Sequence, residues 1–407
     1  MHNKKDLFLK TESFKDKKFT LLFGGDIYLK DNIEISKEII DIFNVADYSV
    51  LNLEAPILNN KLKFEKYPKT GPNLFQNENV AGVLKRLGVK YIGGANNHIM
   101  DFGIEGIKST SDILSKNDIF YSGFGKNLEQ ARVPLNLIDS NITILCVGEE
   151  EFGVSSEGCP GYYSMYFDEI LEQIKYLKNR NKFVVIFAHG GGEEIPLPSL
   201  YIVNKYKEFI DSGADLVVGH HPHVPQGYEE YKGKLIFYSL GNFIHSSFTK
   251  SLGILLKVII VKSAIKSFQI IPIMVQDNIA KIDCEQELNN YINLCNKVLQ
   301  DALLRGSVYQ EQAIYMYNSY YHSYFKNIFS AKKCLKSLIK RFLKKSQMSS
   351  KLESEFLLLN LIRNRSHREF IEIALKILTG EIKDLSDESS LKYFQDLMDK
   401  INKSTRI

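Results

Sequence analysis

The segment LVVGHHPH at residues 216–223 decides the class of fold that this chain adopts. It opens with three apolar residues, two of them β-branched, which favours a short buried strand. Gly219 follows, and then come His220, His221 and His223, three of the nine histidines in the chain. Packing alone explains such a cluster poorly. The segment therefore indicates a metal site at the end of a buried strand.

Polar segments follow five other short apolar runs in the same way. The runs and the segments after them are 19–23 with Gly24-Gly25-Asp26, 48–51 with Asn52-Leu53-Glu54, 91–94 with Asn96-Asn97-His98, 183–188 with His189-Gly190-Gly191-Gly192-Glu193, and 235–238 with Ser239-Leu240-Gly241-Asn242-Phe243. Ligand sites of open α/β sheets form at the carboxyl ends of the strands. We therefore expect these side chains to converge on one rim.

Amphipathic stretches lie between the apolar runs. Residues 168–179 carry apolar side chains at helical spacing, and residues 198–212 stop at Gly213, as a helix with a glycine C-cap would. Residues 254–261 and 264–273 are predicted to form a β-hairpin. The alternation predicts an α/β fold with layered, buried sheets.

The pattern changes after about residue 278, where strand signals fade and 3.6-residue periodicity dominates. We predict two domains, 1–278 and 279–407, the second a helical C-terminal region. Its predicted helices are 285–304, 308–329, 331–345, 351–363, 367–378 and 389–401.

The side chains predicted on the rim suit a divalent cation. Carboxylate, amide oxygen and imidazole are ligands for a metal such as Mn, Fe(II), Zn or Ni. Two such ions about 4 Å apart would bind a phosphoryl or carbonyl oxygen and activate a water molecule.

The ordered motifs GD, NLE, NNH, HGGGE, GHHPHV and YSLGNF resemble those of the CapA family of poly-γ-glutamate capsule biosynthesis, a branch of the calcineurin-like metallophosphoesterases. The resemblance covers roughly residues 19–275. It implies that residues 1–278 form a metallophosphoesterase-like β-sandwich flanked by helices.

The resemblance also implies a role for each matching residue. It assigns Asp26 and His223 to a first metal, Glu54 to a bridging position, and Asn97, His189 and His221 to a second metal. Next to Asn97, His98 corresponds to the residue that stabilises the transition state or protonates the leaving group, so His98 and Asp26 are the predicted catalytic residues. Glu193 and Asn242 correspond to groups behind the ligands or on the substrate side.

One position departs from the pattern of the wider superfamily. That superfamily has Asp-x-His after its first strand, whereas this chain has Asp26-Ile27-Tyr28. The first metal would have one imidazole fewer, so either one ion or two is compatible with the sequence.

The same residue types also have purely structural interpretations. Asp26 is of a type common in turns, Glu54 would suit a solvated strand end, and Asn97 would suit a cap for a helix starting near Asp101. Within the histidine cluster, His220 is the best candidate for a purely structural role. His245 stays ambiguous.

Charge is distributed unevenly along the chain. Residues 281–407 hold 21 basic and 15 acidic residues, a net of +6, so the total of +4 leaves −2 for residues 1–280. The basic segment 331–345 is predicted to be a helix that either packs on the core with a solvated basic face or binds anionic lipid or polymer as a peripheral membrane contact. The acidic core and the lack of an aromatic-basic platform argue against nucleic-acid binding.

The composition predicts a cytoplasmic protein. Five scattered cysteines without a CxxC pair argue against a disulfide framework, and neither a signal peptide nor a transmembrane helix is indicated.

Two functions remain open on this basis. The first is a metal-dependent hydrolase acting on a phosphoester, or on an amide or ester of an anionic polymer, in capsule or polyglutamate synthesis. The second is a non-catalytic metal-binding assembly factor within a capsule-synthesis complex.

Overall fold

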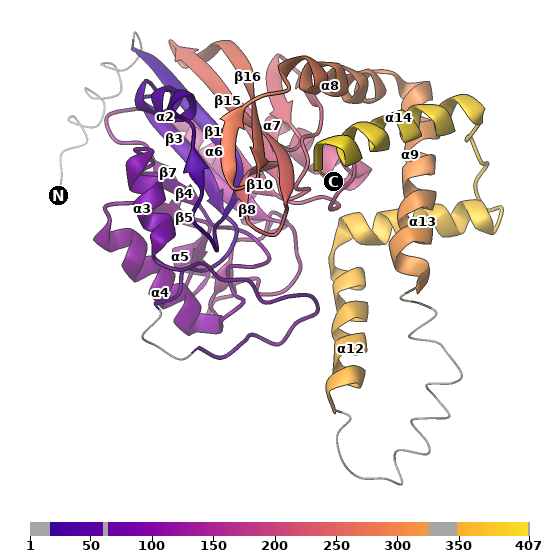
Figure 1. The fold of residues 1–407 in the computed structure, drawn as a ribbon, viewed down its shortest axis with the longest axis horizontal. Coiled ribbons are helices and arrows are strands. Elements are labelled where there is room, and N and C mark those ends of the chain that lie inside the picture. The colour runs from indigo at the N-terminus through magenta and orange to yellow at the C-terminus, as the bar shows by residue number, and fades with distance from the viewer. Residues whose placement is uncertain (1–16, 60–63, 324, 326–347, 406–407) are drawn as a thin grey trace.

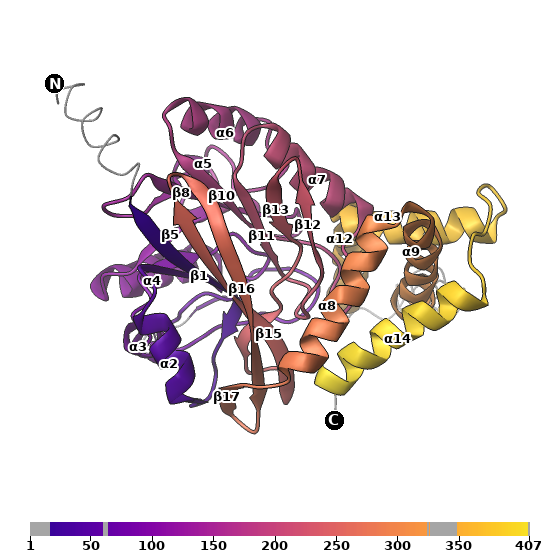
Figure 2. The ribbon, with the colours of Figure 1, turned by 90° about the horizontal axis from the view of Figure 1, so that it is seen from above.

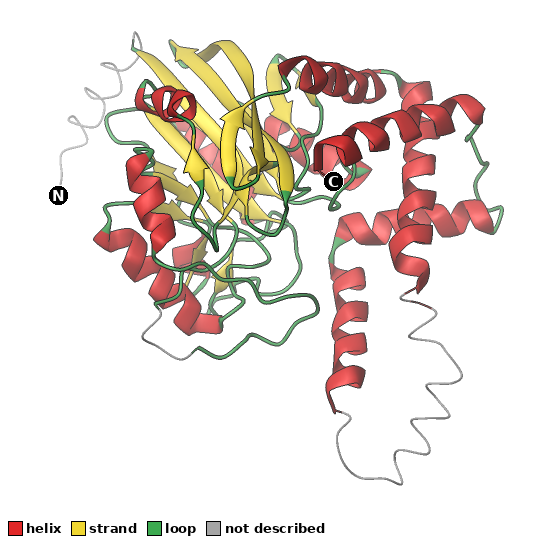
Figure 3. Ribbon diagram, viewed as in Figure 1, coloured by secondary structure: helices red, strands yellow, loops and turns green. Residues whose placement is uncertain are grey.

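The computed structural model describes residues 17–59, 64–323, 325 and 348–405. Two mixed β-sheets pack face to face, with helices outside them (Figures 1 and 3). The larger sheet has the order β2-β17-β16-β15-β1-β3-β4-β5, with β14 also paired to β1, and the smaller has the order β12-β13-β11-β10-β8-β7. The predicted layered α/β sandwich is confirmed.

The larger sheet is built from β1 (Lys18–Tyr28), β2 (Glu34–Ile35), β3 (Tyr48–Leu53), β4 (Tyr91–Gly93), β5 (Phe120–Ser122), β14 (Asn242–His245), β15 (Lys250–Val261), β16 (Ala264–Gln276) and β17 (Ile279–Ile282). The smaller is built from β7 (Leu135–Asn136), β8 (Ile142–Gly148), β10 (Phe183–His189), β11 (Leu216–His220), β12 (Tyr228–Tyr231) and β13 (Lys234–Phe237), and β6 (Phe124–Gly125) pairs separately with β9 (Gly161–Tyr162). The predicted hairpin is confirmed as β15 and β16, which are antiparallel neighbours.

Strand β10 shows why both faces of the smaller sheet are apolar. Alternate side chains of a strand point to opposite faces. Phe183, Val185 and Phe187 enter the core between the two sheets, where the Phe187 ring lies 6.1 Å from that of Phe23 on β1. The intervening Val184 and Ile186 pack under helices on the outer face.

The outer layers are helical. Helices α2 (Lys37–Asn44), α3 (Asn79–Arg86) and α4 (Gly103–Lys116) pack on the larger sheet, and α6 (Glu169–Asn179) and α7 (Leu200–Asp211) cover the smaller one (Figure 2). A short helix, α5 (Leu128–Ala131), follows β6. Helix α7 begins at the Ser199 N-cap, whose hydroxyl accepts from the Ile202 amide, and ends just before Gly213. The two helices predicted in this half, α6 and α7, are confirmed.

The C-terminal region is helical, as predicted, but one predicted boundary is wrong. The break predicted between the helices 285–304 and 308–329 lies earlier, at Asp301, between α8 (Glu285–Gln300) and α9 (Ala302–Met316). The Asp301 carboxylate accepts from the amides of Leu303 and Leu304 and so starts a new helix. Helix α9 continues into a π-helical turn, η1 (Tyr317–Tyr321).

Among the described residues of this region, three further helices follow: α12 (Met348–Arg363), α13 (Arg365–Leu378) and α14 (Glu388–Thr405). The predicted basic helix 331–345 lies outside the described residues. Leu288, Tyr291 and Leu397 of the helical region share one apolar core with the sheets, and Figure 1 shows these helices beside the sandwich. The division into domains at residue 278 stays a prediction.

Within the described ranges, no helix is both long enough and apolar enough to cross a bilayer.

Candidate metal centre

The carboxyl ends of strands from both sheets meet at one rim of the sandwich. Asp26 lies near the end of β1 and pairs in register with Asn52 of the parallel strand β3. His189 ends β10 and pairs with His220, which ends β11. The parallel arrangement thus brings residues from distant parts of the chain to one edge.

A glycine allows the chain to close around this edge. Asp26 donates its amide to the Gly241 carbonyl, and Asp26 pairs with Asn242 at the start of β14. At Gly25, an added Cβ would lie only 1.7 Å from the Gly241 oxygen, so a side chain there would push β14 away.

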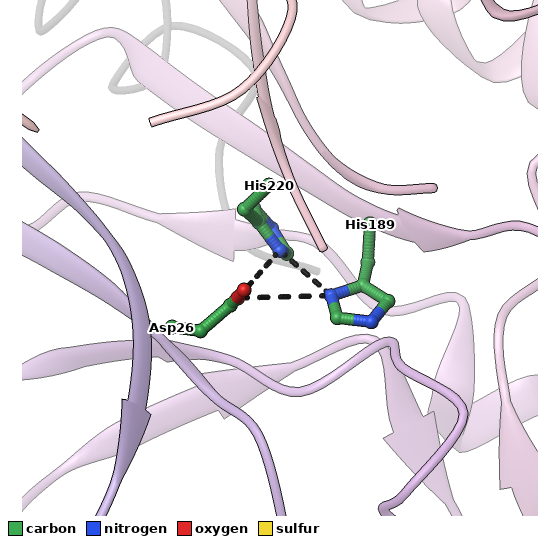
Figure 4. A group of neighbouring side chains, drawn as sticks. All are labelled: Asp26, His189 and His220. Carbon is green, nitrogen blue, oxygen red and sulfur yellow. Dashed lines mark hydrogen bonds and ion pairs between the residues drawn. The ribbon is translucent and has the colours of Figure 1, made fainter. Parts of the chain in front are cut away.

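The fully buried Asp26 carboxylate is the centre of the cluster. Its Oδ1 lies 3.2 Å from His220 Nδ1, and its Oδ2 lies 3.5 Å from His223 Nδ1. Figure 4 shows Asp26 facing the rings of His189 and His220, whose Nδ1 atoms are 2.9 Å apart. The side-chain amide of Asn52 donates to both Asp26 Oδ1 (2.8 Å) and Glu54 Oε2 (2.9 Å).

The two buried carboxyl groups differ in their protonation. Burial would raise the pKa of Asp26, but hydrogen bonds from His220 and His223 outweigh it and hold the pKa well below its usual range. Burial raises the pKa of Glu54 well above its usual range, and the nearby Asp26 charge raises it further. A cation between the two would favour the charged form of both.

The histidines are also held in different states. Burial, reinforced by neighbouring imidazoles, lowers the pKa of His189 well below its usual value and also lowers the pKa of His221, so both rings are neutral as metal ligands must be. Burial would lower the pKa of His223, but its hydrogen bond to Asp26 and the charge of that group raise the pKa to about 9. A metal bound through His223 would have to displace this proton.

The backbone around these rings is strained. His221 has a φ of 103° and His223 a φ of 60°, values that are uncommon for residues with a Cβ. Strain of this kind persists where the surrounding structure enforces it, often at functional sites.

The side chains fit a bound metal ion. Among the described residues, the ligand atoms of four groups lie within 4.8 Å of one another: Asp26 with His189 and His220, Glu54 with His189 and His221, Asp26 with Glu54 and His223, and Glu193 with His221 and His223. Several of their buried polar atoms have no hydrogen-bond partner, namely Glu54 Oε1, His220 Nε2 and both ring nitrogens of His221. Unpaired buried polar atoms are costly, and coordination to a cation would satisfy them.

The structure places the other predicted site residues around this cluster. Asn97 Oδ1 lies 3.1 Å from His189 Nε2, and Asn242 Oδ1 lies 3.0 Å from His223 Nδ1. Glu193 is exposed at the edge of the cluster, and its carboxylate lies within 4.8 Å of ring nitrogens of His221 and His223. All the predicted ligands meet here, and their individual roles remain predictions.

His98 belongs to a second, adjoining network. Its Nδ1 lies 2.7 Å from Asp101 Oδ2, and Asp101 Oδ1 forms a buried ion pair with Lys69 Nζ at 2.5 Å. His98 Nδ1 also lies 3.0 Å from Lys69 Nζ, which only donates, but its shorter contact is with Asp101, which accepts. We therefore assign the His98 proton to Nδ1, which leaves Nε2 available for proton transfer.

Sequence reasoning missed four members of the site: His220, Asn52, Asp101 and Lys69. His220 was read as structural, but it contacts Asp26 directly. The Asn-Leu-Glu motif could have indicated Asn52, because side chains two residues apart on a strand lie on the same face. Asn52 therefore shares a face with the predicted ligand Glu54. No local pattern marks Lys69, which reaches His98 through the fold alone.

Several known proteins are similar to this chain in sequence. The family model for the bacterial capsule synthesis protein PGA_cap matches residues 20–247. The capsule biosynthesis protein CapA of Bacillus anthracis is 31% identical over 255 residues, covering 56% of this chain and 60% of that protein. The PGA biosynthesis protein CapA of Bacillus subtilis is 29% identical over 250 residues, covering 58% and 65%.

A probable polyglutamine synthesis accessory protein of Mycobacterium tuberculosis is 27% identical over 184 residues, covering 40% of this chain and 48% of that protein. The chain therefore spans less than two thirds of the length of these curated relatives. The family match covers more than half of the chain and includes every predicted site residue. The expected CapA resemblance is thus confirmed, and the chain belongs to the family of bacterial capsule synthesis proteins, PGA_cap.

Proposed function

We propose that this protein is a metal-dependent hydrolase of capsule or polyglutamate synthesis, acting on a phosphoester or on an amide or ester of an anionic polymer. The proposal rests on the buried cluster in which Asp26 and Glu54 lie beside the imidazoles of His189, His220, His221 and His223. Several polar atoms of this cluster lack hydrogen-bond partners. The names of the Bacillus relatives support the biological setting.

Asp26, Glu54, Asn97, His189, His221 and His223 would hold the ion or ions, with His220 as a further candidate ligand. Bound metal would polarise the scissile group and lower the pKa of a water molecule. Asn52 positions the two carboxylates by donating to both.

Proton transfer to the leaving group falls to His98. Asp101 fixes the imidazole through Nδ1, so Nε2 is the nitrogen that would deliver the proton. The buried ion pair with Lys69 holds the Asp101 side chain in place. An aspartate that orients a histidine in this way usually makes the ring a better acid–base group.

The proposal is tested by metal analysis of the purified protein with a screen of p-nitrophenyl phosphate and γ-glutamyl substrates. We expect bound Mn, Fe, Zn or Ni and turnover that chelation removes. Asp26→Asn should lose metal and activity, whereas His98→Ala should keep the metal and lose about 100-fold or more in kcat. Asp112→Asn, on the exposed face of α4, is the matched control and should behave like the wild type.

A second candidate is a non-catalytic assembly factor that binds metal and polymer. Tyr28 stands where the wider superfamily has a metal-binding histidine, and the mycobacterial relative is described as an accessory protein. Bound metal without turnover on the whole panel would favour this role over hydrolysis.

A further inference from the structure

A cavity of about 280 Å³ adjoins the candidate metal centre and is lined from two sides. The sandwich contributes polar side chains, among them Lys69, Asn97, His98 and Glu193. The opposite side comes from the C-terminal helices, which sequence reasoning did not connect with the site.

The wall formed by these helices combines apolar side chains with the polar groups of Tyr320, Tyr321, Asn360 and His367. Met316 of α9, Tyr321 of η1, and Leu357 and Leu361 of α12 face the cavity, together with His367 of α13. Tyr321 and His367 are held together by a hydrogen bond of 2.6 Å between the hydroxyl and Nδ1. The cavity therefore joins polar side chains near the metal centre to apolar surface from Met316, Leu357 and Leu361.

Two buried carboxylates after β8 fix this wall to the sandwich. Glu149 accepts from the backbone amide and the hydroxyl of Ser366 at the start of α13, and from the amide of Gly191 beside the metal centre. Because one carboxylate binds both segments, the wall and the His189 loop are positioned together.

Glu151 makes a second connection. It accepts from Asn364 (3.1 Å) and Asn360 (3.4 Å) of the C-terminal region, and from the side chain of the predicted ligand Asn97 (3.4 Å). Glu151 therefore connects the wall to Asn97, one of the residues that would hold the metal.

One polar atom of the wall has no partner. Asn360 is 9% exposed and lines the cavity, and its Oδ1 accepts no hydrogen bond. The side-chain nitrogen of Asn360 donates to Glu151, which leaves Oδ1 as a buried acceptor without a donor. A buried, unsatisfied acceptor beside an apolar wall is typical of a ligand pocket.

We infer that the C-terminal helices form the leaving-group side of the active site and select anionic substrates whose leaving group is small and apolar. The inference rests on the proposed hydrolase function and names its substrate class. The anionic end lies toward the metal centre, Lys69 and His98, and the apolar part lies against Met316, Leu357 and Leu361.

The test compares the binding of two non-hydrolysable anions, phenylphosphonate and methylphosphonate, to the metal-loaded full-length protein by calorimetry. Both molecules carry a phosphonate group, so the difference between their affinities measures the contact of the phenyl ring with the wall. We expect phenylphosphonate to bind about ten-fold tighter or more. Leu361→Ala should reduce that preference at least about three-fold.

Ile362→Ala is the matched control, because Ile362 follows Leu361 on α12 but is 55% exposed. It should keep the wild-type preference. If Leu361→Ala fails to fold, Leu357→Ala, which is only half-buried, tests the same wall.

Equal binding of the two phosphonates by the wild type, or equal loss of preference in both Leu361→Ala and Ile362→Ala, would overturn the inference. Neither result would affect turnover, which tests the hydrolase proposal separately. Conversely, selective binding without any turnover would refute hydrolysis and leave the apolar wall established.

Discussion

At the scale of single residues, the candidate site consists of two linked sets of buried groups. One set surrounds Asp26 and is suited to a metal ion, and the other links His98, Asp101 and Lys69. Asp101 connects the second set, because its two oxygens contact the imidazole and the ammonium group separately. It also accepts from the Leu74 amide, which fixes its orientation.

Asp101→Asn should lower kcat by about 10- to 100-fold while the metal content stays unchanged. An amide in place of the carboxylate no longer holds the proton on Nδ1 or supports the imidazolium that forms. Steady-state kinetics and metal analysis on the same preparation measure both effects. Asp112→Asn is the control, and a wild-type kcat in Asp101→Asn would exclude the proposed role of Asp101.

At the scale of elements, helix α13 is attached to helix α7 through a partly buried carboxylate. The oxygens of Glu369 accept from the amides of Leu200 (3.0 Å) and Tyr201 (2.7 Å) in the first turn of α7. Burial raises the pKa of Glu369 to about 7, although these amides act in the opposite direction. The Glu369 carboxyl therefore keeps its proton to a higher pH in the folded protein than in the unfolded chain.

This difference predicts how stability depends on pH. Between about pH 4.5 and 7 the native state holds the proton and the unfolded state does not, so the contribution of Glu369 to stability falls as pH rises through that window. In Glu369→Gln, the free energy of unfolding should decline by about 1–2 kcal/mol less over this pH range than in the wild type. Urea unfolding at pH 5 and pH 7.5 measures it.

Glu372→Gln provides the comparison, because Glu372 is exposed on the same helix and pairs with Lys376. Its pH dependence should stay close to that of the wild type. If the Glu369→Gln and wild-type proteins lose the same stability between the two pH values, Glu369 does not titrate in this range.

At the scale of the whole molecule, one apolar core joins the sheets to the C-terminal helices. Leu397 of α14 is fully buried in the same cluster as Phe23 and Phe187 of the two sheets. The helices also supply one wall of the cavity beside the metal centre. The helical region is therefore part of the structure that forms the site.

A shared core predicts one cooperative unfolding transition. Leu397→Ala should destabilise the whole protein by about 2–5 kcal/mol, because it leaves a cavity in that core. Leu391→Ala on the same helix, where Leu391 is 42% exposed, should cost far less. Two calorimetric transitions, only one of them shifted by Leu397→Ala, would show instead that residues 279–407 unfold as a separate unit.

The strands, the helices that cover them and the residue types at each strand end could be predicted from the amino-acid sequence, because β-branched runs, helical periodicity and glycines at turns are local signals. The sequence also carried the CapA motifs and the predicted ligands, which the structure brings to one rim. The break between the predicted helices 285–304 and 308–329 was placed a few residues too late, because the helical period continues past Asp301, whose side chain caps α9.

Which residues contact one another follows from the packing of the folded chain. His220 contacts Asp26, although 194 positions separate them in the sequence. Lys69 joins His98 through the buried ion pair with Asp101. Hydrogen bonds to Glu149 and Glu151 hold α12 and α13 beside the cavity. These contacts depend on the order and direction of strands in two sheets and on how the last helices pack against them. No local pattern encodes that arrangement, because a hydrogen bond depends on separation in space and not on separation along the chain.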